Sequence, residues 1–495
     1  MANKTRIIFR ADGNNKIGLG HVVRSMALAA MLRDEFECVF AIQAPSAELR
    51  ELLQQTCHGV IMLPASPPTE DRFIHELAAY IAPDVVVVLD GYSFDTAYQQ
   101  SIKSKGCPLI CLDDIHAYPF VADAVLNQAG GVTKDAYRTA PYTQLLLGPK
   151  YALLRQPFLQ AASQARNFPA DKVRVLLNMG GADPENHTLQ VAKELVRLKS
   201  ITQVEIVVGG AYKHVVELQR WLKKHPAFAL HQNLAADAMC RLMQQCPVAV
   251  TSASGVAQEY AAVGGALFIL QTAENQQAFY TFLTASGIAH PYESFASLKT
   301  EDLRPAFGAQ LQVQRQYYDG QSDVRLQQVF HSFRLRTLTT LRKVSEEDMH
   351  LLYEWNNDPE VRRRSFNPAP IPLENHRQWF HVKLADPNCI IYLAVVNGDP
   401  VAQIRFDIKG DTATISYLIS KAYRGQGLGH TVLLKGVEQL RKERADIQEI
   451  EGLVQLDNTA SVRAFEKAGF TNGPASEQHP EAHRFVLGLV PPQEV

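Results

Sequence analysis

The run Asp84-Val-Val-Val-Val-Leu-Asp90 is the clearest indication of the fold in the first part of the chain. An uninterrupted apolar run of this kind is typical of a strand that is buried on both faces. Similar short runs occur at Arg6–Arg10, Glu37–Ile42 and Leu109–Asp113, and helix-like stretches such as Val22–Asp34 lie between them. This alternation predicts a parallel sheet wrapped by helices.

The same alternation starts again in the middle of the chain. Strands are expected at Val173–Asn178, Gln203–Val208, Phe228–His231, Val248–Thr251 and Ala266–Leu270. We interpret Leu154–Asp171, with its prolines and polar residues, as the hinge between two doubly wound domains, residues 1–155 and 156–335. Such tandem domains commonly hold a nucleotide-bearing ligand in the cleft between them.

The alternation stops near residues 333–340. Ser345 and Asp348 then have the spacing of a capping box at a helix start. An antiparallel meander with a turn at Gly398-Asp-Pro400 is expected next, over Ile390–Val396, Ala402–Ile408 and Thr412–Ile419. Residues 339–490 are therefore predicted to form a separate α+β domain.

Composition excludes several classes of function. The 495-residue chain has a formal net charge of −2 and 46% hydrophobic residues, so no basic field would attract nucleic acid or anionic lipid. No uncharged apolar run approaches the roughly 20 residues that span a bilayer, and we expect no signal peptide. The seven cysteines form no CxxC pair, which predicts reduced thiols in a cytoplasmic protein and no metal site.

The stretch Gly18-Leu-Gly-His21 follows the first predicted strand and begins a helix. Glycines there let a ligand approach the backbone, and the helix N-terminus favours negative charge. A neutral histidine at this position can accept a proton from water. A tight turn with a solvated histidine explains the four residues equally well.

Two further glycine-rich turns follow strands of the second domain, in Asn178–Thr188 and Thr251–Glu259. The amides of Ser254–Val256 are placed to hold a pyrophosphate. The Glu259 carboxylate, on the following helix, is expected to accept hydrogen bonds from both ribose hydroxyls. Each turn alone is a weak signal, because such turns are common in α/β proteins.

Five motifs in order resemble the UDP-sugar hydrolases of the pseudaminic acid pathway: RADGNNKIGLGHVVRSMALA (10–29), DGY (90–92), CLDD (111–114), NMGGADPENHT (178–188) and AENQQ (273–277). The resemblance implies two Rossmann-like domains in a GT-B arrangement and the release of UDP from UDP-2,4-diacetamido-2,4,6-trideoxy-β-L-altropyranose. It makes His21 the general base for an attacking water. The expected substrate-binding residues are Gly20, Tyr92, Gly180, Gly181, Ser254, Gly255, Val256, Glu259 and Asn275.

Alternatives remain open around this predicted site. Tyr92 and Asn275 are expected near the sugar but would also suit as polar caps of the helices that follow them. Three aspartates, Asp12, Asp113 and Asp114, would either orient His21 or the sugar or cap loops. Arg10 and Arg24 are candidate phosphate partners.

The third domain contains Arg424-Gly-Gln-Gly-Leu-Gly429 before a long helix, and Asn458-Thr-Ala-Ser461 further on. The pair resembles the GNAT N-acetyltransferases, which implies acetyl-CoA as cosubstrate. The expected cofactor-binding residues are Ile419, Arg424, Gly425, Gln426, Gly427, Leu428, Gly429, Asn458 and Ser461. Phe465 departs from the family, because a tyrosine is common there and its hydroxyl can protonate the leaving thiolate.

Two further groups of residues are candidates in this domain. His376 and Glu354 would accept the amine proton, although both would also suit an ordinary helix surface. Arg362-Arg-Arg364 would either contact the UDP of the acceptor or form a solvated face.

Together these patterns predict a bifunctional enzyme that acetylates the 4-amino group of a UDP-amino-sugar and then hydrolyses the product. Its partners would be the UDP-linked amino sugar and acetyl-CoA, with neither nucleic acid nor membrane involved. Two alternatives are a GT-B glycosyltransferase with an attached acyltransferase and a UDP-sugar-sensing module on a protein acetyltransferase. The sequence leaves open whether the chain forms a homo-oligomer.

Overall fold

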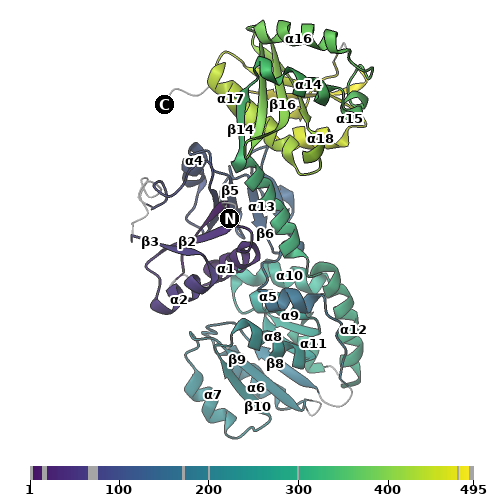
Figure 1. Cartoon of the computed structure of the whole chain (residues 1–495). Helices are drawn as coiled ribbons and strands as arrows, with labels where there is room; N and C mark the ends of the chain where they lie inside the picture. Colours follow the sequence, from purple (N-terminus) through teal and green to yellow (C-terminus); the bar gives the residue numbers. More distant parts are fainter. Residues whose placement is uncertain are drawn as a thin grey trace.

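The computed structural model describes residues 4–13, 19–64, 76–169, 173–198, 201–297, 300–476 and 479–489, and its sheets form three separate units (Figure 1). Two units are parallel α/β sheets and the third is a mixed sheet, as the sequence predicts.

The first sheet has the strand order β3-β2-β1-β4-β5-β6-β7, with every pair parallel. Its strands are β1 (Arg6–Ala11), β2 (Glu37–Gln43), β3 (Gly59–Leu63), β4 (Val86–Asp90), β5 (Leu109–Leu112), β6 (Ala124–Asn127) and β7 (Gln144–Leu147). Its helices include α1 (Gly20–Leu32), α2 (Ala47–Thr56) and α4 (Thr96–Ser104). The order reverses between β1 and β4, and ligands of such sheets bind beyond the carboxyl ends of the strands at this point.

The second sheet repeats this topology, in the order β10-β9-β8-β11-β12-β13. Its strands are β8 (Arg174–Asn178), β9 (Gln203–Val208), β10 (Phe228–Gln232), β11 (Val248–Ser252), β12 (Ala266–Leu270) and β13 (His290–Pro291). Its helices are α6 (His187–Leu195), α7 (Val215–Leu222), α8 (Ala236–Gln245), α9 (Gly255–Val263), α10 (Gln277–Ala285) and α11 (Tyr292–Ser297). The carbonyl of Gln128, just beyond β6, accepts a hydrogen bond from Gln258 of α9 at 3.5 Å. The segment after β6 therefore lies against the first turns of α9.

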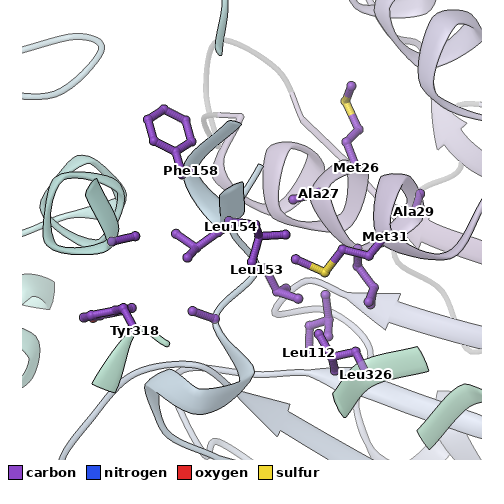
Figure 2. Packing of buried hydrophobic residues seen from close by; sticks show 14 of the residues in the cluster. Met26, Ala27, Ala29, Met31, Leu112, Leu153, Leu154, Phe158, Tyr318 and Leu326 are labelled. Carbon is purple, nitrogen blue, oxygen red and sulfur yellow. The ribbon is translucent and has the colours of Figure 1, made fainter. Parts of the chain in front are cut away.

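The predicted hinge is more structured than expected. Within Leu154–Asp171, of which residues 170–171 lie outside the described part, helix α5 (Gln156–Ala162) packs against α8 and α9. Leu153 and Leu154, just before α5, share one buried cluster with Met31 of α1 (Figure 2). The connection between the two α/β units is thus part of a common core and not a solvated linker.

Two long helices, α12 (Thr300–Tyr317) and α13 (Ser322–Leu338), follow the second sheet. Leu326 and Phe330 of α13 belong to the same buried cluster as α1. Figure 1 shows α13 running from this region up to the C-terminal unit. Helix α13 ends at Leu338, and the next strand begins at Thr339 without an intervening loop.

The third sheet has the order β14-β15-β16-β17-β18-β20-β19 and is antiparallel except between β17 and β18. Its strands are β14 (Thr339–Lys343), β15 (Cys389–Val396), β16 (Asp399–Lys409), β17 (Thr412–Ile419), β18 (Glu449–Gln455), β19 (Thr471–Asn472) and β20 (Ala482–Gly488). Its helices are α14 (Met349–Asn356), α15 (Pro359–Arg363), α16 (Leu373–Ala385), α17 (Leu428–Glu443) and α18 (Thr459–Lys467).

Local chemistry in the third unit confirms one prediction and corrects another. The capping box of Ser345 and Asp348 is present, with both reciprocal hydrogen bonds. The turn expected at Gly398-Asp-Pro400 is instead made by Asn397 and Gly398, whose φ angles are 53° and 93°. Two consecutive positive φ values suit a tight hairpin, so Asp399 and Pro400 begin β16.

Candidate active sites

His21 is held by a carboxylate from the neighbouring strand. Helix α1 places the imidazole in its first turn, and its Nδ1 lies 2.7 Å from Oδ1 of Asp90, the last residue of β4. A carboxylate only accepts hydrogen bonds, so this contact favours the tautomer with a proton on Nδ1, which leaves Nε2 as the acceptor. Nη2 of Arg24 also lies 3.0 Å from the same Nδ1. This pair of side chains can therefore take a proton from a water molecule at Nε2.

Asp90 is fully buried and heavily paired. It accepts hydrogen bonds from Arg24 at 2.5 and 2.8 Å and from the Ser25 hydroxyl at 2.9 Å. Burial alone would raise the pKa of this carboxyl, but Arg24 and His21 hold it below its usual value. Asp90 thus stays ionised and stabilises an imidazolium when His21 takes up a proton. The DGY motif contains this aspartate, but the sequence pattern alone gives it no role beside His21.

Tyr92, which the resemblance places near the sugar, lies next to His21. Its ring meets the His21 ring edge-on, with 4.6 Å between centroids, and 53% of its surface is exposed. Its hydroxyl lies 3.5 Å from Asp114, which also accepts a hydrogen bond from Arg24 at 2.8 Å. The structure therefore brings His21, Tyr92 and Asp114 together. A Cβ placed on Gly20, the residue before His21, would meet no atom within 4 Å. Residues 16–18, which precede it in the glycine motif, lie outside the described part of the chain.

Other candidates of the first unit have structural partners. Arg10 is buried and pairs with Asp12 at 2.6 Å and with Glu76 at 3.1 Å, so its interpretation as a phosphate partner is not supported. Arg24 bridges two carboxylates, which likewise occupies its guanidinium. Asp113 accepts hydrogen bonds from the backbone of the loop that follows it and from the Tyr137 hydroxyl, as a loop cap does.

The glycine turns of the second unit meet at one edge of its sheet. Gly180 follows β8 with a φ of 93°, and its amide donates to the Asn178 side chain at 2.8 Å. A Cβ on Gly180 would lie 3.6 Å from the Ser252 hydroxyl, and one on Gly181 would meet nothing within 4 Å. Ser252 in turn hydrogen-bonds Ser254, the residue before α9, at 2.9 Å. The open edge beside these turns, where Gly255 and Val256 start α9, suits an anionic group.

Glu259 already has a charged partner. Its two carboxylate oxygens accept hydrogen bonds from Arg155 at 2.8 and 2.9 Å. Burial raises its pKa, although Arg155 opposes the shift. A ribose bound to Glu259 would have to share this carboxylate with Arg155, so the expected ribose contact stays a prediction.

Asn275 lies in a short 3-10 helix, Glu274–Gln276, and is exposed. Its neighbour Gln276 accepts hydrogen bonds from the backbone and hydroxyl of Thr272. Neither this 3-10 helix nor α10 has a side-chain cap. The polar capping role considered for Asn275 is therefore not observed, and its exposed amide faces solvent.

The third unit opens where two parallel strands separate. Strands β17 and β18 pair only over Thr412–Thr414 and Glu449–Glu451, and then diverge. A cavity of about 830 Å³ lies at this opening. All but one of the predicted cofactor-binding residues line it, namely Ile419, Arg424, Gly425, Gly427, Leu428, Gly429, Asn458 and Ser461.

The glycine turn before α17 has the conformation that the sequence implies. Gly425 and Gly427 have φ angles of 78° and 80°, and a Cβ at either position would meet no atom within 4 Å. The amides at the start of α17 therefore border open space, which suits a pyrophosphate. Arg424 braces the turn by donating to the Ile419 carbonyl at 3.0 Å and pairing with Asp358. Gln426 does not line the cavity and donates to the Ala422 carbonyl.

Two more of the predicted cofactor-binding residues, Asn458 and Ser461, form hydrogen bonds within the protein. The Asn458 side chain caps α18 by accepting from the Ser461 amide at 3.2 Å. The Ser461 hydroxyl lies 3.1 Å from the hydroxyl of Tyr417 on β17, which also lines the cavity. Phe465 is only 2% exposed and stacks on Phe485. The sequence pattern gives Tyr417 no role, because this tyrosine precedes the Arg424–Gly429 motif.

The two candidate proton acceptors are not in the cavity. His376 is 2% exposed, packs against Tyr353 and Trp379, and does not line the cavity. Burial lowers its pKa. Glu354 is exposed on α14 and also lies outside the lining. The interpretation of these two side chains as amine bases is therefore not supported. Packing buries His376, whereas Glu354 has the ordinary helix-surface position that was its other interpretation.

Arg362 and Arg364 of the basic stretch Arg362–Arg364 line the cavity, and all three arginines have partners within the protein. Arg362 donates to the carbonyls of Asn356 and Asn367, and Arg363 and Arg364 pair with Glu360.

Among the described residues, no group of three or more His, Cys, Asp and Glu is arranged to hold a metal ion. No helix in the described ranges is both long and apolar enough to cross a membrane.

Comparisons with known proteins agree with this division. Residues 339–471 match the acetyltransferase (GNAT) domain family. An uncharacterized protein of Methanocaldococcus jannaschii is 23% identical over 94% of this chain and 96% of its own length. The UDP-2,4-diacetamido-2,4,6-trideoxy-beta-L-altropyranose hydrolase of Campylobacter jejuni is 25% identical over 58% of this chain and 99% of its own length. The aminoglycoside N(6')-acetyltransferase type 1 of Klebsiella pneumoniae is 26% identical over 26% of this chain and 73% of that protein. The chain therefore combines a region with two Rossmann-like sheets, related to a UDP-sugar hydrolase, with a C-terminal GNAT acetyltransferase domain.

Proposed function

We propose that the chain is a bifunctional enzyme of pseudaminic acid biosynthesis. The C-terminal domain would acetylate the 4-amino group of UDP-4-amino-4,6-dideoxy-N-acetyl-β-L-altrosamine with acetyl-CoA. The N-terminal region would then hydrolyse the product, UDP-2,4-diacetamido-2,4,6-trideoxy-β-L-altropyranose. The two reactions are consecutive, since the product of the first is the substrate of the second.

The observation that carries the hydrolase half is the 2.7 Å contact between His21 and Asp90. Nε2 of His21 takes a proton from a water molecule whose oxygen bonds to the anomeric carbon. The bond between this carbon and the phosphate oxygen breaks, and UDP leaves with the electron pair and with inversion at carbon. Asp90 stabilises the resulting imidazolium, and Tyr92 lies where it would contact the sugar.

The second unit would bind the UDP. The amides at Gly181 and the start of α9 would supply donors for the pyrophosphate, beside the turn where Gly180 donates to Asn178. Glu259 would hold the ribose by exchanging one of its hydrogen bonds with Arg155. Asn275, exposed before α10, offers a carboxamide for the sugar.

The acetyltransferase half rests on the cavity where β17 and β18 diverge. The neutral amine of the acceptor attacks the thioester carbonyl, the carbon–sulfur bond breaks, and CoA leaves as a thiolate. The proton that the nitrogen loses passes through solvent to the thiolate. The turn Gly425–Gly429 would hold the pyrophosphate of acetyl-CoA. The polar residues Asn356, Gln403 and Arg405 line the same cavity and would face the acceptor sugar.

Mass spectrometry of products made from UDP-amino-sugars tests this function. With acetyl-CoA, we expect an acetylated UDP-sugar that decays to UDP and a free diacetamido sugar. Without acetyl-CoA, we expect little UDP. UDP release that requires an added sugar or lipid acceptor would favour a glycosyltransferase, and binding without turnover would favour a sensing module.

A further inference from the structure

The cavity of the acetyltransferase domain is not enclosed by that domain alone. Asp123, Tyr142 and Gln144 of the N-terminal unit line it, together with Ser332 and Phe333 of α13. Figure 1 shows the C-terminal unit seated on the end of the N-terminal unit, with α13 running between them. Residues from the hydrolase half of the chain therefore border the space expected for acetyl-CoA.

A buried ion-pair network fixes this arrangement. Arg336, near the end of α13, pairs with Asp123 of the N-terminal unit and, at 3.2 Å, with Glu438 of α17. Lys103 of α4 pairs with the same aspartate at 2.7 Å. Burial would raise the pKa of Asp123, but Arg336 and Lys103 hold it below its usual value. Asp123 thus stays charged. If the two units moved apart, the buried charge of Arg336 would lose its partner Glu438.

The two units also touch directly beside the cavity. A Cβ on Gly469, just after α18, would lie 3.6 Å from the Pro141 side chain and 3.7 Å from the amide nitrogen of Tyr142. The backbone before β7 therefore rests against the end of α18. This contact places Tyr142 and Gln144 close to Lys467, which also lines the cavity.

The side chains at this junction have the chemistry to bind a nucleotide. Arg463 and Lys467 of α18 line the cavity, are exposed, and form no ion pair within the described part of the chain. The Gln144 amide makes no side-chain hydrogen bond to any described residue. The Tyr142 hydroxyl donates to the Val121 carbonyl at 2.9 Å, which fixes its ring at the cavity wall.

We propose that the N-terminal unit completes the acetyl-CoA site, with Tyr142 and Gln144 contacting the adenosine end of the cosubstrate and Arg463 and Lys467 facing its 3′-phosphate. An aromatic ring packs on an adenine base, a carboxamide pairs with its edge, and lysine and arginine attract a phosphate. The pyrophosphate, which joins this adenosine to the pantetheine arm, lies at the turn before α17. This inference rests on the proposed acetyltransferase activity.

One consequence is that the two halves of the chain are not independent for cosubstrate binding. Tyr142 and Gln144 lie far from the thioester, so their contacts are equal in the ground state and the transition state. Their loss should raise KM for acetyl-CoA and leave kcat unchanged.

Steady-state acetyl transfer by full-length variants tests the proposal. Gln144→Ala and Tyr142→Leu are compared with Gln55→Ala, an exposed glutamine of α2 that is not part of the cavity lining. The second probe is adenosine 3′,5′-bisphosphate, the nucleotide half of CoA, as an inhibitor competitive with acetyl-CoA. We expect both test variants to raise KM for acetyl-CoA and Ki for this nucleotide by about 3- to 10-fold, with kcat unchanged. Gln55→Ala should equal the wild type.

An unchanged KM in Gln144→Ala would overturn the proposal, as would a raised KM with an unchanged Ki for the nucleotide. If Tyr142→Leu fails to fold, Gln144→Ala decides alone, because the Gln144 side chain has no hydrogen-bond partner among the described residues. A wild-type chain that transfers no acetyl group would instead refute the acetyltransferase function itself, together with this extension of it. UDP release by Gln144→Ala should match the wild type and reports that its fold is intact.

Discussion

Asp90 Oδ1 lies 2.7 Å from Nδ1 of His21, although 69 residues separate them in the chain. The parallel pairing of β1 with β4 sets Asp90 opposite Ala11, the last residue of β1. The strand register thus brings a buried carboxylate beside the proposed general base.

Asp90→Asn should lower the rate of UDP release by about 10²–10⁴-fold while leaving acetyl transfer unchanged. An asparagine oxygen can still accept from Nδ1, but its neutral amide cannot stabilise the imidazolium, and a flipped amide favours the wrong tautomer. Single-turnover release of UDP measures the effect. Asp114→Asn is the matched comparison, since Asp114 contacts Arg24 and Tyr92 but not the imidazole. Equal losses in the two variants would mean that Asp90 acts only through Arg24.

Much of the fold could be predicted from the sequence because buried parallel strands appear as continuous apolar runs. The strands that contain Ile8, Val87 and Val250 are examples, each fully buried. The glycine turn before α17 was equally clear, because positive φ angles at Gly425 and Gly427 require that residue type.

The predictions that failed concern side chains whose positions depend on contacts between residues that are distant in the sequence. Asp90 looked like the polar end of a strand, and only the sheet register brings it to His21. His376 looked like a surface base, and only the packing of α14 against α16 buries it. Tyr142 and Gln144 carry no periodicity or motif that relates them to a cavity lined mainly by residues from Ser332 onward.

Variants of the Arg155–Glu259 pair test whether Glu259 holds the ribose or serves only to pair with Arg155. If Glu259 holds the ribose, Glu259→Ala should raise KM for the UDP-sugar clearly more than Arg155→Ala does, with little change in kcat for either. If the carboxylate serves only to pair with Arg155, the two variants should behave alike. Titration calorimetry with UDP gives the same comparison without turnover.

His430 lies in the first turn of α17, and its lowered pKa should make the stability of the protein depend on pH. Burial, reinforced by the charge of Arg336, lowers its pKa to about 4. Between pH 6.5 and 4 the unfolded histidine therefore binds a proton that the folded one does not, so the free energy of unfolding falls as the pH falls. From pH 6.5 to 4.5 this one group should cost about 2 kcal/mol.

Urea unfolding of the wild type and His430→Gln at these two pH values measures the contribution. The variant should lose about 2 kcal/mol less than the wild type over this interval. His350→Gln, at an exposed position, is the control and should keep the wild-type dependence. Identical slopes for wild type and His430→Gln would show that His430 is not buried in the neutral form.

The most direct test of the central claim assays both activities in one pair of full-length variants, His21→Ala and Gly427→Val. His21→Ala removes the proposed base, and Gly427→Val forces a branched side chain into a φ of 80° beside the open pyrophosphate space. We predict that His21→Ala still acetylates the UDP-amino-sugar but releases no UDP. Gly427→Val should still release UDP from sugar that is already acetylated, but transfer no acetyl group. Loss of both activities in either variant, or retention of both, would contradict two separate active sites.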